Sequence, residues 1–200
     1  MKKFVGLLSI ADAELLEAYA AKSHAILEFG MGGSTHIFAQ CLRDGDRLVS
    51  VETRPEWIVL TQKRLHKLGA TKGVALLQDA AWQAKPTPGP FDLVFIDGAA
   101  PRRLPFALDA WRRLSIGGWL LFHDTRNRRD RDIDNALRFI RTTLDEVDEV
   151  RLNEKSGGRT SNLTAIRRKK AEPWVNWPKT EGKPAWAYGD GEPPESFWRS

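Results

Sequence analysis

The sequence predicts an α/β protein built on a doubly wound, mostly parallel sheet of seven strands. Two patterns predict this fold class. Short, nearly continuous apolar runs alternate with longer stretches of helical spacing. Continuous apolar runs are typical of strands in a parallel sheet that helices cover on both faces. A glycine-rich segment also follows the first apolar run, where open α/β sheets bind their ligands.

The first half of the chain predicts three helix–strand pairs. In order, they are a helix at 12–21, a strand at 25–29, a helix at 34–42, a strand at 47–51, a helix at 55–68 and a strand at 74–77. Asp12 lies near the start of the first helix. Pro55 suits the first turn of the third helix and Gly69 suits the position just past its end, so both limits of that helix are marked.

The second half continues the alternation and ends in a hairpin. Its expected elements are a strand at 91–96, a helix at 104–114, a strand at 119–122, a helix at 130–144, and strands at 146–152 and 161–167. The Ser156-Gly157-Gly158 segment predicts a turn between the last two strands. We therefore expect a C-terminal antiparallel hairpin at one edge of the sheet.

The last thirty residues differ from the rest, so we divide the chain into a domain at 1–170 and an irregular arm at 171–200. The arm holds five prolines and four tryptophans and shows little periodicity. Soluble chains rarely expose so much apolar surface, so we expect the arm to be at least partly ordered. It could lie on its own domain, cover the active site, or join a second copy in a homo-oligomer.

The composition excludes several classes of protein. Of the 200 residues, 42% are hydrophobic and 28% charged, which is typical of a globular chain. One cysteine, Cys41, excludes a disulfide framework and a cysteine-rich zinc module. The longest apolar run is too short to cross a membrane. With a lone cysteine and no convincing signal peptide, we expect a cytoplasmic protein without a membrane partner.

The net charge of +5 is unevenly distributed, since 20 of the 31 basic residues lie after residue 100. They cluster at 102–103, 112–113, 126–131 and 167–170. Such clusters indicate an anionic substrate, a nucleic acid, or simply solvated faces, and the composition leaves all three open.

The most informative segment is the glycine loop from Gly30 to Thr35, which lies between the first strand and the following helix. Glycines there let a ligand approach the backbone and the start of the helix. A dinucleotide site needs a third glycine, but Thr35 stands in its place. Glu28, just before the loop, is unusual beside a pyrophosphate and suits a ligand with a positive amino group.

The run Glu28-Phe-Gly-Met-Gly-Gly-Ser34 resembles motif I of the class I S-adenosylmethionine-dependent methyltransferases, in the small O-methyltransferase-like branch. The resemblance extends over residues 10–167 and implies the Rossmann-like methyltransferase fold with S-adenosylmethionine as cofactor. It places Glu28 near the methionine moiety of the cofactor. It places the loop backbone against the cofactor, through Gly30, Met31, Gly32, Gly33, Ser34 and Thr35.

Other strand ends carry the polar residues that this resemblance implies. Glu52 ends the second strand, where a carboxylate can accept hydrogen bonds from both ribose hydroxyls. Asp79 and Ala80 follow the third strand, and the resemblance places Asp79 at the adenine amino group, with Trp82 as a wall for the ring. Asp97 ends the fourth strand at the same crevice and is a further cofactor contact.

The candidate catalytic residues are Asp97, His123 and Asp124, at the ends of the fourth and fifth strands. His123 suits a general base because the reference pKa of histidine is about 6.5. Asp97 and Asp124 could instead hold a divalent ion such as Mg²⁺. Related catechol-type enzymes carry Asp-Asn where this chain has Asp124-Thr125, so we favour the metal-free route. His123 and Asp124 can face one crevice only if the strand has ended before them.

We expect methyl transfer to a small-molecule acceptor, in the first instance a hydroxyl. The arginine-rich segment after Asp124 suggests an anionic acceptor. A nucleic-acid acceptor is disfavoured because the fourth strand ends without an Asn/Asp-Pro-Pro-Tyr/Phe motif. The alternatives are an NAD-dependent oxidoreductase and a noncatalytic interaction protein that uses a methyltransferase-like domain.

Overall fold

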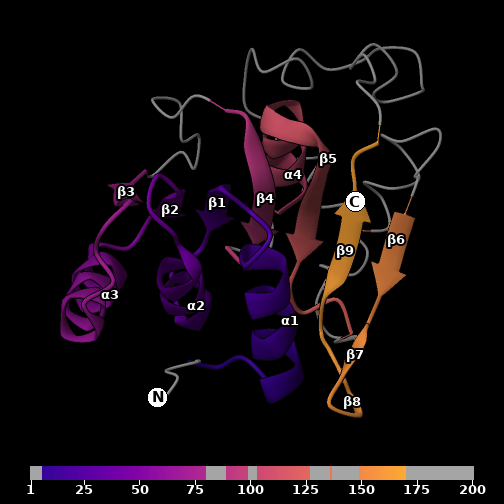
Figure 1. The fold of residues 1–200 in the computed structure, drawn as a ribbon, viewed down its shortest axis with the longest axis horizontal. Coiled ribbons are helices and arrows are strands. Elements are labelled where there is room, and N and C mark those ends of the chain that lie inside the picture. Colours follow the sequence, from indigo (N-terminus) through magenta and orange to yellow (C-terminus); the bar gives the residue numbers. More distant parts are fainter. Residues whose placement is uncertain (1–5, 80–88, 99–102, 127–135, 137–148, 170–200) are drawn as a thin grey trace.

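The computed structural model confirms the predicted fold class and describes residues 6–79, 89–98, 103–126, 136 and 149–169. A seven-stranded sheet in the order β3-β2-β1-β4-β5-β9-β6 forms the centre of the protein (Figure 1). Its strands are β1 (Ala25–Phe29), β2 (Arg47–Glu52), β3 (Val74–Gln78), β4 (Phe91–Ile96), β5 (Leu114–Phe122), β6 (Glu149–Leu152) and β9 (Thr164–Arg167). Only β9 runs against its neighbours.

The path of the chain through the sheet creates a crevice. The chain builds β1, β2 and β3 outward in one direction, and it then returns to the other side of β1 to form β4 and β5. At such a reversal the connections leave in opposite directions from neighbouring strand ends. Ligands of open α/β sheets bind there, beyond the carboxyl ends of the strands.

Helices cover both faces of the sheet, as the continuous apolar runs predict. They are α1 (Ile10–Ala20), α2 (Gly33–Cys41), α3 (Pro55–Leu68) and α4 (Arg103–Arg113). The first three pack on one face, against side chains such as Ile26 and Phe95, while α4 packs on the other, against Leu27 and Phe29. Neighbouring residues of a strand point to opposite faces, so Glu28 points toward the same face as Ile26.

The structure moves several of the expected boundaries. Helix α1 begins at Ile10, two residues early, because the Ser9 hydroxyl caps it by accepting a hydrogen bond from the Asp12 amide. Strand β5 already begins at Leu114, whereas the expected strand began at residue 119. Leu114 pairs with Phe91 and Trp119 pairs with Leu93, so the intervening residues bulge out.

The C-terminal hairpin differs in detail from the expected one. Strands β6 and β9 pair antiparallel, but β9 begins at Thr164 rather than at residue 161. A small ribbon of β7 (Lys155–Ser156) and β8 (Arg159–Thr160) stands between them and carries the predicted glycine turn. The expected helix at 130–144, apart from buried Ala136, lies outside the described residues. So do the arm, Ala80 and Trp82.

None of the helices in the described part of the chain is both long and apolar enough to cross a membrane.

Candidate active site

A cavity of about 1000 Å³ opens at the carboxyl ends of β1, β2, β4 and β5. Nine of the residues that the sequence predicts for the site line this one cavity: Gly30, Met31, Gly32, Gly33, Ser34, Glu52, Asp97, His123 and Asp124. Glu28, Thr35 and Asp79 are described but are not among the lining residues. The structure thus brings the glycine loop and three polar strand ends together, as the parallel sheet predicts.

Two glycines of the loop have different structural roles. Gly30 has a φ of +99°, and a Cβ placed on it would lie 2.7 Å from the carbonyl carbon of Asp97, so β1 and β4 meet there backbone to backbone. Gly32 has extended backbone, and a Cβ on it would meet nothing within 4 Å. Gly30 is therefore required by the fold, whereas Gly32 leaves space open in the cavity.

Glu28 lies behind the loop, completely buried, with its carboxylate held by three hydroxyl groups. The hydroxyls of Ser34 and Thr35 donate to it at 2.5 and 2.7 Å, and that of Ser50 donates at 2.5 Å. These bonds tie the start of α2 to β1 and β2. A direct contact between Glu28 or Thr35 and a cofactor stays a prediction; in the structure both residues hold the loop from behind.

Burial raises the pKa of Glu28 to about 7, although the three hydroxyl bonds act in the opposite direction. For a carboxyl whose pKa is raised in the folded state, the stabilising contribution is present below pH 4.5, its usual value, and is lost as the pH rises through about 7. Near neutral pH the folded chain therefore holds this carboxyl in both its protonated and its ionised form.

We expect a Glu28→Gln variant to lose this pH dependence. The amide keeps the size of the side chain and cannot ionise, so the wild-type free energy of unfolding should fall relative to the variant's between pH 5 and 8. The difference should amount to roughly 1.4 kcal/mol for each unit of the pKa shift. Urea unfolding of both proteins across this range measures the difference. If the free energies of unfolding of wild type and variant changed with pH in parallel, the pKa of Glu28 would not be raised by burial.

Glu52 lies at the cavity wall, and its contact with a ribose stays a prediction. One oxygen accepts hydrogen bonds from the amides of Thr53 at 2.8 Å and Arg54 at 3.1 Å, and the other lies 3.4 Å from the Met31 amide. These bonds fix the carboxylate at the cavity wall. Trp57 lines the same wall and packs under the Arg54 guanidinium, 5.2 Å from its ring centroid.

Trp57 is an aromatic wall residue that the sequence analysis missed. Its position in the first turn of α3, soon after Glu52, was the available signal. Trp82, which we expected in this role, lies outside the described residues, as does Ala80. The amide of Asp79 donates to the Glu52 carbonyl at 3.0 Å, so Asp79 lies beside the site, and its predicted contact with adenine stays a prediction.

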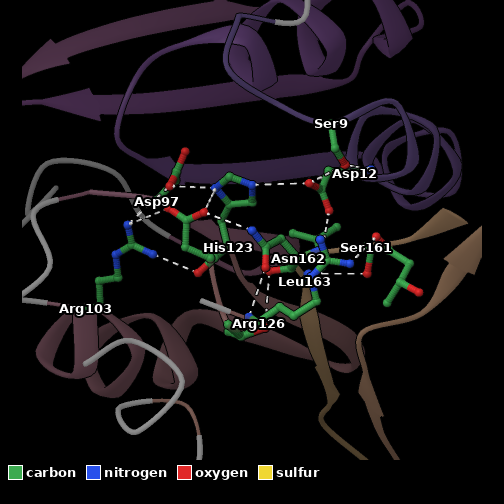
Figure 2. A network of polar contacts seen from close by, with 12 residues as sticks. Ser9, Asp12, Asp97, Arg103, His123, Arg126, Ser161, Asn162 and Leu163 are labelled. Carbon is green, nitrogen blue, oxygen red and sulfur yellow. Dashed lines mark hydrogen bonds and ion pairs between the residues drawn. The ribbon is translucent and has the colours of Figure 1, made fainter. Parts of the chain in front are cut away.

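In the same cavity, two carboxylates and two cationic side chains form a compact network (Figure 2). The Nδ1 atom of His123 lies 3.0 Å from Asp97 and 3.6 Å from Asp124. An Arg103 Nη2 atom lies 3.3 Å from Asp97 and 3.9 Å from Asp124. The two carboxylates therefore share the same pair of cations.

Arg103 is the site residue that sequence reasoning missed most clearly, because it stood in a basic cluster with no assigned role. Its side chain is buried, and it donates to the carbonyl oxygens of Gly98 at 3.0 Å and His123 at 2.8 Å. It therefore ties the end of β4 to the end of β5. Its place at the start of α4, soon after Asp97, was the signal for it.

His123 has a different acid–base character from the one expected. Burial by itself lowers the pKa of the imidazole, but hydrogen bonds with Asp12 and Asp97 and the charges of Asp97 and Asp124 outweigh it and raise the pKa to about 10. A ring that is protonated at neutral pH has no lone pair to accept a proton. The raised pKa favours a role for the ring in holding the carboxylates, and the general-base role of His123 stays a prediction.

The condition we set for His123 and Asp124 to share the crevice is met. Strand β5 ends at Phe122, and the next residues leave the strand. Asp124 takes a left-handed conformation with a φ of +60°, which ends the alternation of the strand. Both side chains consequently line the cavity.

Three of these groups, Asp97, His123 and Asp124, offer ligand atoms within 4.8 Å of one another, the spacing of a metal site. As they stand, these residues do not fit a divalent ion. Arg103 already lies against the same carboxylates, and the raised pKa of His123 favours its cationic form, which is not a metal ligand. The Thr125 hydroxyl, in the place of the expected third ligand, is buried and donates to the Asn162 carbonyl at 3.2 Å.

Residues 27–125 match the model of a protein family described as a methyltransferase domain. The chain belongs to this methyltransferase family. The match spans the glycine loop, Glu52, Asp97 and the end of β5. It decides for a methyltransferase against the two alternatives, the oxidoreductase and the noncatalytic interaction protein.

Solved structures resemble this methyltransferase in fold. The O-methyltransferase TomG from Streptomyces achromogenes, which is involved in tomaymycin synthesis and was solved with SAM, is 20% identical, with 82% of each chain covered and a TM-score of 0.67. An O-methyltransferase from Bacillus cereus, solved with SAH, is 16% identical over 82% of this chain and 84% of that one, with a TM-score of 0.66.

A third structure, the SAH-bound methyltransferase PaMTH1 of Podospora anserina, is 20% identical over 79% of this chain and 78% of that one, with a TM-score of 0.62. No curated protein matches the chain. These likenesses support the fold. The residues that line the cavity of this methyltransferase bear on its cofactor and its acceptor.

Proposed function

We propose that this methyltransferase transfers a methyl group from S-adenosylmethionine to the hydroxyl of a small molecule. One observation carries the proposal: a single cavity is lined by the glycine loop and Glu52 together with Asp97 and Asp124. The neighbours solved with SAM or SAH support the choice of cofactor. When bound, S-adenosylmethionine supplies a sulfonium methyl group for in-line displacement by a nucleophile.

The glycine loop and Glu52 suit the cofactor. The backbone at Gly32 leaves room for a ligand, and Glu52 presents a fixed carboxylate to a ribose diol. Hydroxyl groups of Ser34, Thr35 and Ser50 hold the Glu28 carboxyl behind the loop, away from the cavity lining.

The two carboxylates of the cavity suit the acceptor. The side chains of Asp97 and Asp124 are 27% and 32% exposed, so part of each carboxylate faces the cavity. Each can accept a hydrogen bond from an acceptor hydroxyl, which orients its oxygen toward the methyl group. When the C–S bond breaks and the C–O bond forms, the hydroxyl proton leaves toward one of these carboxylates or to water. His123 and Arg103 hold the pair in place and balance its charge.

This assignment needs no divalent ion, because two cations already balance the two carboxylates. An anionic acceptor stays a prediction that no described contact supports. Arg126, the first residue of the expected basic segment, is exposed and donates to the Thr160 carbonyl at 3.1 Å, and residues 127–135 lie outside the described part. The exclusion of nucleic acid and a homo-oligomer formed through the arm also stay predictions.

Isothermal titration calorimetry tests the cofactor directly. We expect S-adenosylmethionine and S-adenosylhomocysteine each to bind at one site with a Kd in the micromolar range, and NAD⁺ and NADH to give no heat of binding. Thr35 in place of the third dinucleotide glycine is the physical reason for the difference. NAD⁺ binding without S-adenosylhomocysteine binding would overturn the proposed function.

A further inference from the structure

Asp12 belongs to the first turn of α1, yet it reaches the active site. Its side chain is almost completely buried. One carboxylate oxygen accepts a hydrogen bond from the Asn162 amide at 2.6 Å. The other accepts from the Ser9 hydroxyl at 2.6 Å and lies 3.5 Å from the Nε2 atom of His123 (Figure 2). A residue that merely capped the helix would need only the contact with Ser9.

The contact with His123 passes through the imidazole ring to the cavity. The two ring nitrogens point in opposite directions, and Nδ1, on the far side from Asp12, lies 3.0 Å from Asp97. A carboxylate beside each ring nitrogen fixes the orientation of the imidazole. Asp12 consequently determines how His123 presents its Nδ1 atom to Asp97.

A second connection runs through Asn162. Its backbone amide donates to Asp12, and its side-chain amide donates to the Asp124 carboxylate at 3.3 Å. Its side-chain oxygen accepts a hydrogen bond from the Arg126 amide at 3.0 Å, which fixes the orientation of the carboxamide. Asp12 thus reaches each of the two acids of the cavity through one intermediate residue.

We infer that Asp12 is a positioning residue of the active site, which holds Asp97 through His123 and Asp124 through Asn162. The inference rests on the proposed function in one respect, that these acids receive the acceptor. It also explains why Gly6, Leu7 and Leu8 line the cavity: the anchor of α1 at the strand ends keeps the segment before the helix at the mouth.

The carboxyl ¹³C signals of Asp97 and Asp124 in the full-length chain test the inference, with S-adenosylhomocysteine calorimetry alongside. Asp12→Asn keeps the size of the side chain and removes the charge that faces His123. We expect it to move both signals, and to move the Asp97 signal in the same direction as His123→Gln does. Ser9→Ala is the matched control, because it weakens the same helix start and leaves the charge of Asp12, His123 and Asn162 in place; it should move both signals much less than Asp12→Asn does.

Asn162→Ala separates the two connections and serves as the second variant if Asp12→Asn does not fold. It removes the side-chain bond to Asp124 and keeps the backbone bond to Asp12, so only the Asp124 signal should move. The inference is overturned if Asp12→Asn, or Asn162→Ala in its place, leaves the Asp124 signal at its wild-type position, or if Ser9→Ala moves the signals equally. Failure of the wild type to bind S-adenosylhomocysteine overturns the proposed function instead, so the two failures are distinguishable.

Discussion

A Gly32→Val variant should fold like the parent chain and fail to bind S-adenosylmethionine. The backbone at Gly32 is extended, a conformation that valine adopts readily, and a Cβ there meets no protein atom within 4 Å. The new side chain therefore projects into the open cavity and takes the space of the ligand. We expect a loss in affinity of roughly 100-fold or more, which corresponds to about 2.7 kcal/mol, with an unchanged melting temperature.

Gly30→Ala provides the contrast within the same loop. Its Cβ would lie 2.7 Å from backbone atoms of Asp97, and its φ of +99° is unfavourable for alanine. We expect this smaller substitution to lower the free energy of unfolding by about 3 kcal/mol or more. Calorimetry and thermal unfolding of both variants separate ligand exclusion from damage to the fold. Wild-type affinity in Gly32→Val would show that the ligand does not lie against this loop.

A His123→Gln variant should lose both stability and the characteristic pH dependence of the wild type. The substitution leaves the buried Asp12 without its cationic neighbour, and breaking a buried ion pair costs roughly 3–5 kcal/mol. Because the folded-state pKa of His123 is raised to about 10, its stabilising contribution is fully present below pH 6.5 and is lost as the pH rises through about 10.

Urea unfolding between pH 6 and 10 measures this effect. The wild-type free energy of unfolding should fall more steeply than that of His123→Gln, by up to about 1.4 kcal/mol per pH unit. His66→Gln, at an exposed position of α3, is the matched control and should follow the wild type. Equal slopes for wild type and His123→Gln would show that His123 is not held protonated between the carboxylates.

The sequence predicted the sheet because local signals agree with the fold. Continuous apolar runs predicted β1, β2, β3 and β4 to within one residue, and Pro55 and Gly69 bounded α3 correctly. The boundary of β5 was missed because Gly117 and Gly118 are typical of a turn. In the structure they accommodate a bulge instead, with Gly117 at a φ of +87°.

The lining of the cavity was predictable for a similar reason. Polar residues at the carboxyl ends of parallel strands meet at one edge, so Glu52, Asp97 and Asp124 could be placed together without a structure. The side chains that each of these carboxylates contacts could not be predicted from the sequence. Asp12 and His123 are far apart in the chain, and no periodicity relates them.

The pKa of His123 depends largely on such distant neighbours. From the reference value the residue suits a base, and the structure raises its pKa by placing Asp12 on one side of the ring and Asp97 on the other. Glu28 is a similar case, since the hydroxyls of Ser34 and Ser50 meet it from two different elements.

The order in which the chain fills the sheet has a consequence for how such an enzyme can diverge. In the proposed function, the wall assigned to the cofactor comes from one continuous stretch, β1 to α3, while the acids assigned to the acceptor come from a later one, β4 to β5. Mutations in the later stretch can alter the choice of acceptor while the earlier one is inherited unchanged. The close backbone contact between Gly30 and Asp97 limits this freedom. A mutation that moves the end of β4 also disturbs the glycine loop after β1.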